Sequence, residues 1–146
     1  MYLTQTIINA VNDTLWYLEE HKNKITEQFK VMPPNVFIEH FLSLKLRFPR
    51  GSGHSSAAKQ LMLQHDNSIL ITPDSRWGYQ DYLMNHIGIP KEKTFSFWDL
   101  SRNIRVYSSL SLVIFDWLDG DQRKKLSELK QKLLYTNDVK LFVELG

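Results

Sequence analysis

The segment of residues 109–115 constrains the fold more than any other part of this chain. After Ser109 its residues are almost all apolar: Leu110, Leu112, Val113, Ile114 and Phe115. A strand with apolar side chains on both faces is typical of a parallel sheet, because helices cover both faces of such a sheet. Parallel strands also need long crossover connections, which helices usually supply. The segment therefore predicts an α/β fold.

Three further segments have the pattern of strands, and helical patterns lie between them. Apolar and polar residues alternate from Ser43 to Phe48, which is the period of a strand. The expected strands are residues 42–48, 68–72, 109–115 and 141–145. The expected crossover helices are residues 54–64, 75–86 and 121–134, whereas residues 95–98 fit neither pattern. Because strands alternate with helices, we expect one small, mostly parallel sheet in which the four strands are neighbours.

The beginning of the chain has the three- and four-residue spacing of an amphipathic helix, which ends at Pro33 and Pro34. With 146 residues, of which 42% are apolar, the chain is long enough for one core. We expect a single domain over residues 1–146, in which residues 40–146 form the α/β core. Residues 1–32 are expected to form a helical appendage that binds a protein partner or a second copy of the chain.

Composition excludes several classes of protein. The chain has no cysteine, which excludes disulfides and thiol catalysis. Lys and Arg number 18 against 16 Asp and Glu, so the net charge of +2 does not indicate a nucleic-acid binder. The charges at 123–125 and 130–132 are expected to form a solvated helix face. No apolar stretch approaches the ~20 residues of a membrane helix, and no basic export signal is present, so we expect a cytoplasmic protein without a membrane contact.

A glycine-containing loop joins the strand at 42–48 to the helix at 54–64. Glycines allow several backbone N–H groups to turn toward one point, and a helix N-terminus adds partial positive charge. This order of strand, loop and helix predicts a phosphate site. Its candidate residues are Arg50, Gly51, Ser52, Gly53, His54, Ser55 and Ser56.

These residues resemble the Walker A segment of P-loop NTPases, in the R-G-S-G-K-[ST] form of phage terminase large subunits and RecA-like helicase motors. Phe48 stands where the first glycine of that signature would be, and His54 replaces the lysine. Residues 112–119 resemble a Walker B strand that ends in Asp116. The resemblance implies that Ser55 and Asp116 hold the Mg²⁺ of ATP or ADP, and that Trp117 stands in place of the catalytic glutamate.

A third segment, residues 72–80, is similar to the T-P-x-x-x-L-x-x-Q element of helicases. That similarity implies that Arg76 and Gln80 contact a single-stranded nucleic acid, DNA included. Together the three similarities cover residues 42–120. The terminase-like loop implies a phage or mobile-element protein that acts in the host cytoplasm.

Hydrolysis of a nucleoside triphosphate needs a cation at the phosphates and a positioned water. His54 is shorter than lysine and uncharged near neutral pH, and Trp117 cannot act as a base. We therefore expect a degenerate, single-lobe P-loop-like protein, not an enzyme, that binds a protein partner, a nucleotide or a nucleic acid without efficient hydrolysis. The alternative is an active ATPase, a helicase- or terminase-type accessory lobe that hydrolyses ATP with a partner. In the simplest alternative, the glycine loop is a plain turn, Asp116 caps a helix and Arg76 is a solvated charge.

Overall fold

The computed structural model describes residues 3–49, 53–73, 79–103 and 109–146. Its centre is a five-stranded sheet in which every printed pairing is parallel, so the expected α/β fold is confirmed. The order of the strands across the sheet is β1-β5-β4-β2-β3. The strands are β1 (Ser43–Leu46), β2 (Ser68–Thr72), β3 (Thr94–Ser96), β4 (Leu110–Asp116) and β5 (Val139–Leu145).

The apolar run of β4 lies in the middle of this sheet. Ile114 is in register with Leu70 of β2 on one side and with Val143 of β5 on the other. All three side chains are fully buried. The four expected strands are contiguous, although β5 separates β1 from β4. The short strand β3 was not expected from the sequence.

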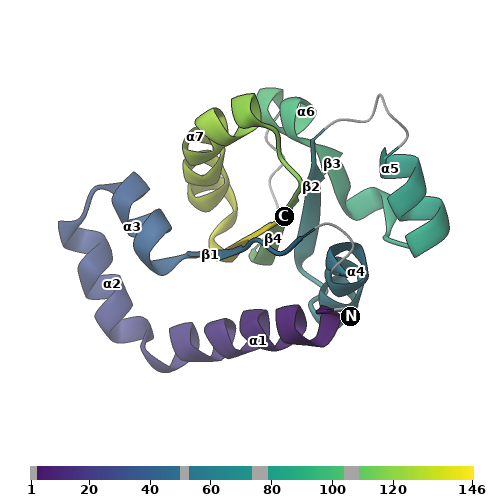
Figure 1. Ribbon diagram of the computed structural model, residues 1–146. Coiled ribbons are helices and arrows are strands. Elements are labelled where there is room, and N and C mark those ends of the chain that lie inside the picture. Colours follow the sequence, from purple (N-terminus) through teal and green to yellow (C-terminus); the bar gives the residue numbers. More distant parts are fainter. Residues whose placement is uncertain (1–2, 50–52, 74–78, 104–108) are drawn as a thin grey trace.

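Helices cover both faces of the sheet, as Figure 1 shows. On one face lie α1 (Thr4–Glu20) and α4 (His54–Gln64), whose apolar residues pack with Leu70, Ile114 and other inward side chains of the strands. On the other face lie α3 (Pro34–Phe41), α6 (Phe97–Arg102) and α7 (Gly120–Asn137), which pack against Ile71, Val113 and Phe142. Successive residues of each strand therefore contribute to two separate cores.

The connection from β2 to β3 is built from short helical pieces. Helix α5 (Tyr79–Tyr82) continues into the π-helical turn η1 (Leu83–Ile87), which ends at Gly88. The 3₁₀ turn η2 (Lys91–Lys93) then leads into β3. Leu83 is fully buried and anchors this connection to the α1–α4 side of the sheet.

The N-terminal segment divides into a packed part and a projecting part. In α1, Ile7 and Val11 are fully buried against the small residues Ala57 and Ala58 of α4. This close packing puts α1 in a layer of the fold, whereas the sequence placed the whole segment outside the sheet. The helical run is interrupted at His21, and the following helix α2 (Lys22–Val31) has no buried residue. Within the described ranges, every helix is too short or too polar to cross a lipid bilayer.

Candidate functional site

Gly53, the beginning of α4 and the end of the aspartate strand meet at the carboxyl edge of the sheet. Helix α4 begins at His54 directly after Gly53, and β4 ends at Asp116. The ring centroids of His54 and Trp117 are 5.5 Å apart, so the beginning of α4 contacts the residue that follows the aspartate. Of the candidate phosphate-binding residues, Arg50, Gly51 and Ser52 lie outside the described residues.

Gly53 gives the chain the turn that starts α4. Its φ is +91°, in the left-handed region that favours glycine. The Thr4 hydroxyl donates a hydrogen bond of 3.2 Å to the carbonyl of Gly53, which ties the turn to the first residue of α1. A side chain on residue 53 would collide with that hydroxyl, because a Cβ would lie 2.2 Å from the Thr4 Oγ1 atom. The position therefore needs glycine for its conformation and for its close contact.

His54 is turned into the protein and is only 3% exposed. Its ring stacks on Phe48 at 6.1 Å and meets Trp117 edge to face. Its Nε2 atom has no hydrogen-bond partner among the described residues. Burial lowers the pKa of His54, so the imidazole is neutral at pH 7. Ser55 is half-buried in the same helical turn, and Ser56 is exposed.

Asp116 is fully buried at the end of β4, in register with Leu145 of β5. It does not cap α7, because the side chain of Asp119 accepts the capping hydrogen bond from the Gln122 backbone at 2.8 Å. Trp117 has a φ of +54°, which is uncommon for a bulky residue and costs about 1–2 kcal/mol. Its ring covers Gly146 so closely that a Cβ there would lie 2.7 Å from the indole. The place that resembles the catalytic glutamate position is thus filled by a packed aromatic ring.

The segment that resembles a nucleic-acid element is partly occupied by internal contacts. The side-chain amide of Gln80 donates a 2.8 Å hydrogen bond to Thr72 Oγ1, and Thr72 is fully buried at the end of β2. The side chain of Gln122 in α7 donates to the Pro73 carbonyl, which fixes the chain just after β2. Arg76 lies outside the described residues. Gln80 therefore supports the end of β2 from within the protein.

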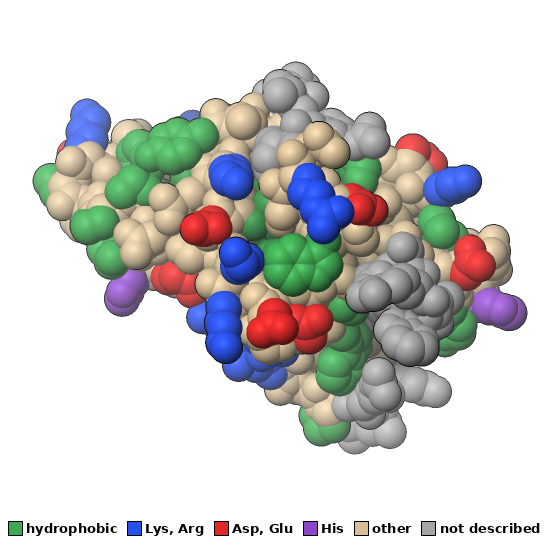
Figure 2. Space-filling model, turned by 90° about the horizontal axis from the view of Figure 1, so that it is seen from above, with side chains coloured by type: hydrophobic (Ala, Val, Ile, Leu, Met, Phe, Trp, Pro, Cys, Tyr) green, Lys and Arg blue, Asp and Glu red, His purple; other side chains and the backbone are tan. Residues whose placement is uncertain are grey.

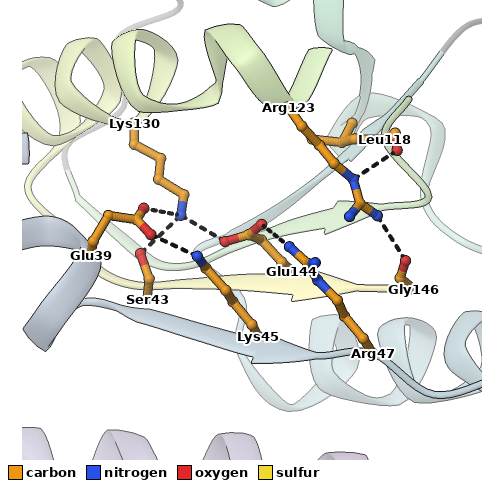
Figure 3. A network of polar contacts seen from close by, with 9 residues as sticks. All are labelled: Glu39, Ser43, Lys45, Arg47, Leu118, Arg123, Lys130, Glu144 and Gly146. Atoms are coloured by element: carbon orange, nitrogen blue, oxygen red, sulfur yellow. Dashed lines mark hydrogen bonds and ion pairs between the residues drawn. The ribbon is translucent and has the colours of Figure 1, made fainter. Parts of the chain in front are cut away.

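Lys130 of α7 is fully buried, so the expectation of a solvated charge at this position is wrong (Figure 3). Its ammonium donates 2.9 Å hydrogen bonds to the Glu39 and Glu144 carboxylates and to the Ser43 hydroxyl. It faces inward because it lies four residues after Leu126 and three before Leu133, on the apolar side of the helix. The polar network joins α7 to α3, β1 and β5.

Two further cations surround this network. Lys45 contacts Glu39 at 2.9 Å, and Arg47 lies 3.9 Å from Glu144. Burial acts to raise the pKa of Glu39, but hydrogen bonds from Lys45 and Lys130 outweigh it and hold that pKa below its ordinary value. The hydrogen bond to Glu39 in turn raises the pKa of Lys45. Both residues are therefore charged at neutral pH.

Arg123 of α7 was expected to be a solvated charge, but it is half-buried and holds the chain around Trp117. Its guanidinium donates hydrogen bonds to the carbonyls of Leu118 at 3.1 Å and Gly146 at 2.9 Å (Figure 3). No motif marks this contact, because both acceptors are backbone atoms. Together, Arg123 and Trp117 keep the ends of β4 and β5 in one rigid unit.

The charges on the face over α6 and α7 are mixed. Figure 2 shows Lys and Arg side chains interspersed with Asp and Glu side chains around hydrophobic ones. Nucleic-acid binding surfaces usually gather positive charge on one face or along one stripe. Among the described residues, no group of three or more His, Asp and Glu lies close enough together to hold a metal ion.

Comparison of the chain with protein-family models, with curated proteins and with solved structures found no match.

We predict that acid weakens the fold through two histidines, the buried His54 and the half-buried His65. Burial lowers the pKa of His54 and of His65 below the ordinary value of about 6.5. The unfolded chain then binds protons that the folded chain does not, so the free energy of unfolding falls as pH falls below about 6.5. Urea denaturation at pH 7.5 and 5.5 measures the effect. His54→Phe should reduce the pH dependence, and the exposed His86→Gln should not; equal dependence in all three proteins contradicts the prediction.

Proposed function

We propose that this chain is a degenerate, single-lobe P-loop-like domain that binds a nucleotide, ATP or ADP with Mg²⁺, without efficient hydrolysis. The observation that carries the proposal is the contact of His54 with Trp117 at the carboxyl edge. It brings the beginning of α4 next to the end of the aspartate strand. In α/β sheets this edge is where ligands bind, and a helix N-terminus attracts phosphate.

The parallel sheet supports the same proposal. β1, which leads toward Gly53, and β4, which ends at Asp116, run parallel on either side of β5, so both strands end at the same edge. The half-buried Ser55 hydroxyl and the buried Asp116 carboxylate are oxygen donors, the kind of ligand that Mg²⁺ prefers. Bound Mg²⁺ would supply charge neutralisation at the phosphates.

The side chains at the two key positions favour binding over turnover. A charged side chain at the phosphates and a base for the attacking water are needed for efficient hydrolysis. His54 is buried and neutral, and the indole of Trp117 offers no base. A nucleotide is preferred to a nucleic acid as the ligand because Gln80 already hydrogen-bonds Thr72 and the visible charges are mixed.

The test is calorimetric titration of the wild type and His54→Lys with ATP and Mg²⁺. A lysine can extend its stem past the aromatic rings and place its ammonium near the loop. We expect the variant to bind ATP more tightly by about 1–3 kcal/mol, roughly fivefold to a hundredfold in affinity. Turnover should stay negligible in His54→Lys, whereas adding Trp117→Glu would supply the missing carboxylate.

A matched control separates the position of the charge from the charge itself. Gln60→Lys adds the same charge to α4, at an exposed residue outside the candidate phosphate site. It should change ATP affinity little. If neither the wild type nor a folded His54→Lys binds, the loop is a plain turn and the proposal is wrong. Mg²⁺-dependent hydrolysis by the wild type would instead support the alternative of an active ATPase.

A further inference from the structure

The carbonyl of Gly53, the residue just before α4, accepts two hydrogen bonds. One comes at 3.0 Å from the backbone N–H of Ala57 and is the first hydrogen bond of α4. The other comes at 3.2 Å from the hydroxyl of Thr4, the first residue of α1. Figure 1 shows the beginning of α1 beside α4. Two donors from different helices therefore fix the direction of this carbonyl.

A fixed carbonyl also fixes the N–H group at the other end of the same peptide bond. The peptide group is planar, and the described residues include no cis peptide bond, so the Gly53 carbonyl and the His54 N–H point in opposite directions. Because the carbonyl points along α4 toward Ala57, the His54 N–H points out of the beginning of the helix. Glycine restricts the backbone less than any other residue, so the second donor on its carbonyl adds a restraint that its own backbone lacks.

The beginning of α4 has no anion of its own. The first N–H groups of a helix have no partner within it, and no side chain of the described residues caps α4. Its first turn also lacks an acidic residue, whereas α7 is capped by Asp119 and has Asp121 in its first turn. A second polar group of His54 is unpaired as well, because Nε2 has no hydrogen-bond partner among the described residues although the residue is only 3% exposed. An anionic ligand would satisfy these N–H groups.

We propose that Thr4 is a positioning residue of the nucleotide site. Its hydroxyl holds the Gly53–His54 peptide group so that the His54 N–H donates a hydrogen bond to a phosphate of the nucleotide. This inference rests on the function proposed above, and it adds a residue of α1 that lies outside the segments that resemble a P-loop. A donor that is held in place before binding loses less conformational entropy when the phosphate arrives, so the affinity is higher.

The attachment of α1 to α4 does not depend on Thr4. Apolar side chains of α1 are fully buried against α4. At the other end of α4, the side-chain amide of Asn12 donates a 3.0 Å hydrogen bond to Gln64, and its oxygen lies 2.9 Å from Nε2 of His65. Asn12 thus links the same two helices far from Gly53, which makes it the matched control for Thr4.

Calorimetric titration of the variants with ATP and Mg²⁺ tests the proposal. Thr4→Val and Thr4→Ala each remove the hydroxyl and should weaken ATP binding by about tenfold. Thr4→Ser keeps the hydroxyl and should bind ATP like the wild type. Asn12→Ala loses a comparable link between α1 and α4 and should also bind like the wild type. Circular dichroism checks that each variant folds.

Two further titrations sharpen the test. Inorganic tripolyphosphate with Mg²⁺ should show the same loss in Thr4→Val as ATP does, because the peptide group contacts phosphate and not the base. The same variants in a His54→Lys background keep the backbone N–H of residue 54 and should show the same loss.

The outcomes separate this inference from the proposed function. If the protein binds ATP and Thr4→Val binds it equally well, the function stands and the role of Thr4 is wrong. The role is also wrong if Asn12→Ala or Thr4→Ser weakens binding as much as Thr4→Val, since the loss would then come from looser packing of α1. If neither the wild type nor His54→Lys binds ATP, the proposed function is wrong and this inference is wrong with it.

Discussion

Replacement of Lys130 by alanine is expected to lower the free energy of unfolding by about 3–5 kcal/mol. The Lys130 ammonium is fully buried and donates three hydrogen bonds of 2.9 Å, two of them to carboxylates. Without it, Glu144 keeps a nearly buried negative charge, and the guanidinium of Arg47 lies 3.9 Å from it, farther than the 2.9 Å of the lost ammonium. A buried charge that has lost its partner is costly because neither water nor a counter-ion stabilises it.

Urea denaturation of three variants separates charge from packing. Lys130→Met keeps most of the volume of the side chain. Its decrease in the free energy of unfolding should therefore come mainly from the carboxylates that have lost their ammonium partner. Lys130→Met combined with Glu144→Gln removes both charges and should cost much less than the sum of the two single changes. Lys132→Ala, at an exposed position of the same helix, should change stability by no more than about 0.5 kcal/mol. Equal losses in Lys130→Ala and Lys132→Ala would contradict the prediction.

The burial of Lys130 shows what the sequence could and could not predict. Its spacing from Leu126 and Leu133 places Lys130 on the apolar side of α7. The sequence therefore contained a signal that this side chain faces the core. Its partners come from α3, β1 and β5, far away along the chain. Such partners depend on how the elements pack, which local patterns do not encode. Because lysine is rarely buried without a partner, a sequence in which the partner is not visible predicts an exposed lysine.

The sheet was predictable because its strands are long or strongly apolar. Four consecutive apolar residues in β4 and the buried run in β2 admit few other structures. The strand β3 has only three residues, too few for a period of two to be recognised. Helix α3 was missed for another reason. Pro33 and Pro34 predict the end of a helix, but proline is also favoured at the first position of the next helix, where its missing N–H is not needed.

For the candidate site, the sequence predicted the order of the elements but not how their side chains pack together. The order of strand, loop and helix, and an aspartate at the end of β4, were both readable in the sequence. The burial of His54 against Phe48 and Trp117 was not, because it depends on three separate elements. The left-handed backbone of Trp117 was equally hidden, since nothing in the local sequence favours it.

Replacement of Gly53 by alanine is expected to destabilise the fold by about 2–4 kcal/mol, and it tests how tightly the loop is tied to α1. A left-handed φ of +91° costs an alanine about 1–2 kcal/mol by itself. The added Cβ would also lie 2.2 Å from Thr4 Oγ1, so α1 or the loop must move. The hydrogen bond from Thr4 to Gly53 would be strained as well.

Two other glycines separate the cost of the left-handed backbone from the cost of the collision with Thr4. Gly88 has a similar φ of +89°, but a Cβ there would meet only the flexible end of Lys59, so Gly88→Ala reports the backbone cost alone. No atom of the described residues lies within 4 Å of a Cβ placed on Gly120, and Gly120→Ala should change stability little. The difference between Gly53→Ala and Gly88→Ala in urea denaturation then measures the collision with Thr4. Gly53→Ala combined with Thr4→Ala should recover most of that difference. If Gly53→Ala and Gly88→Ala cost the same, α1 moves aside freely and does not hold the loop in place.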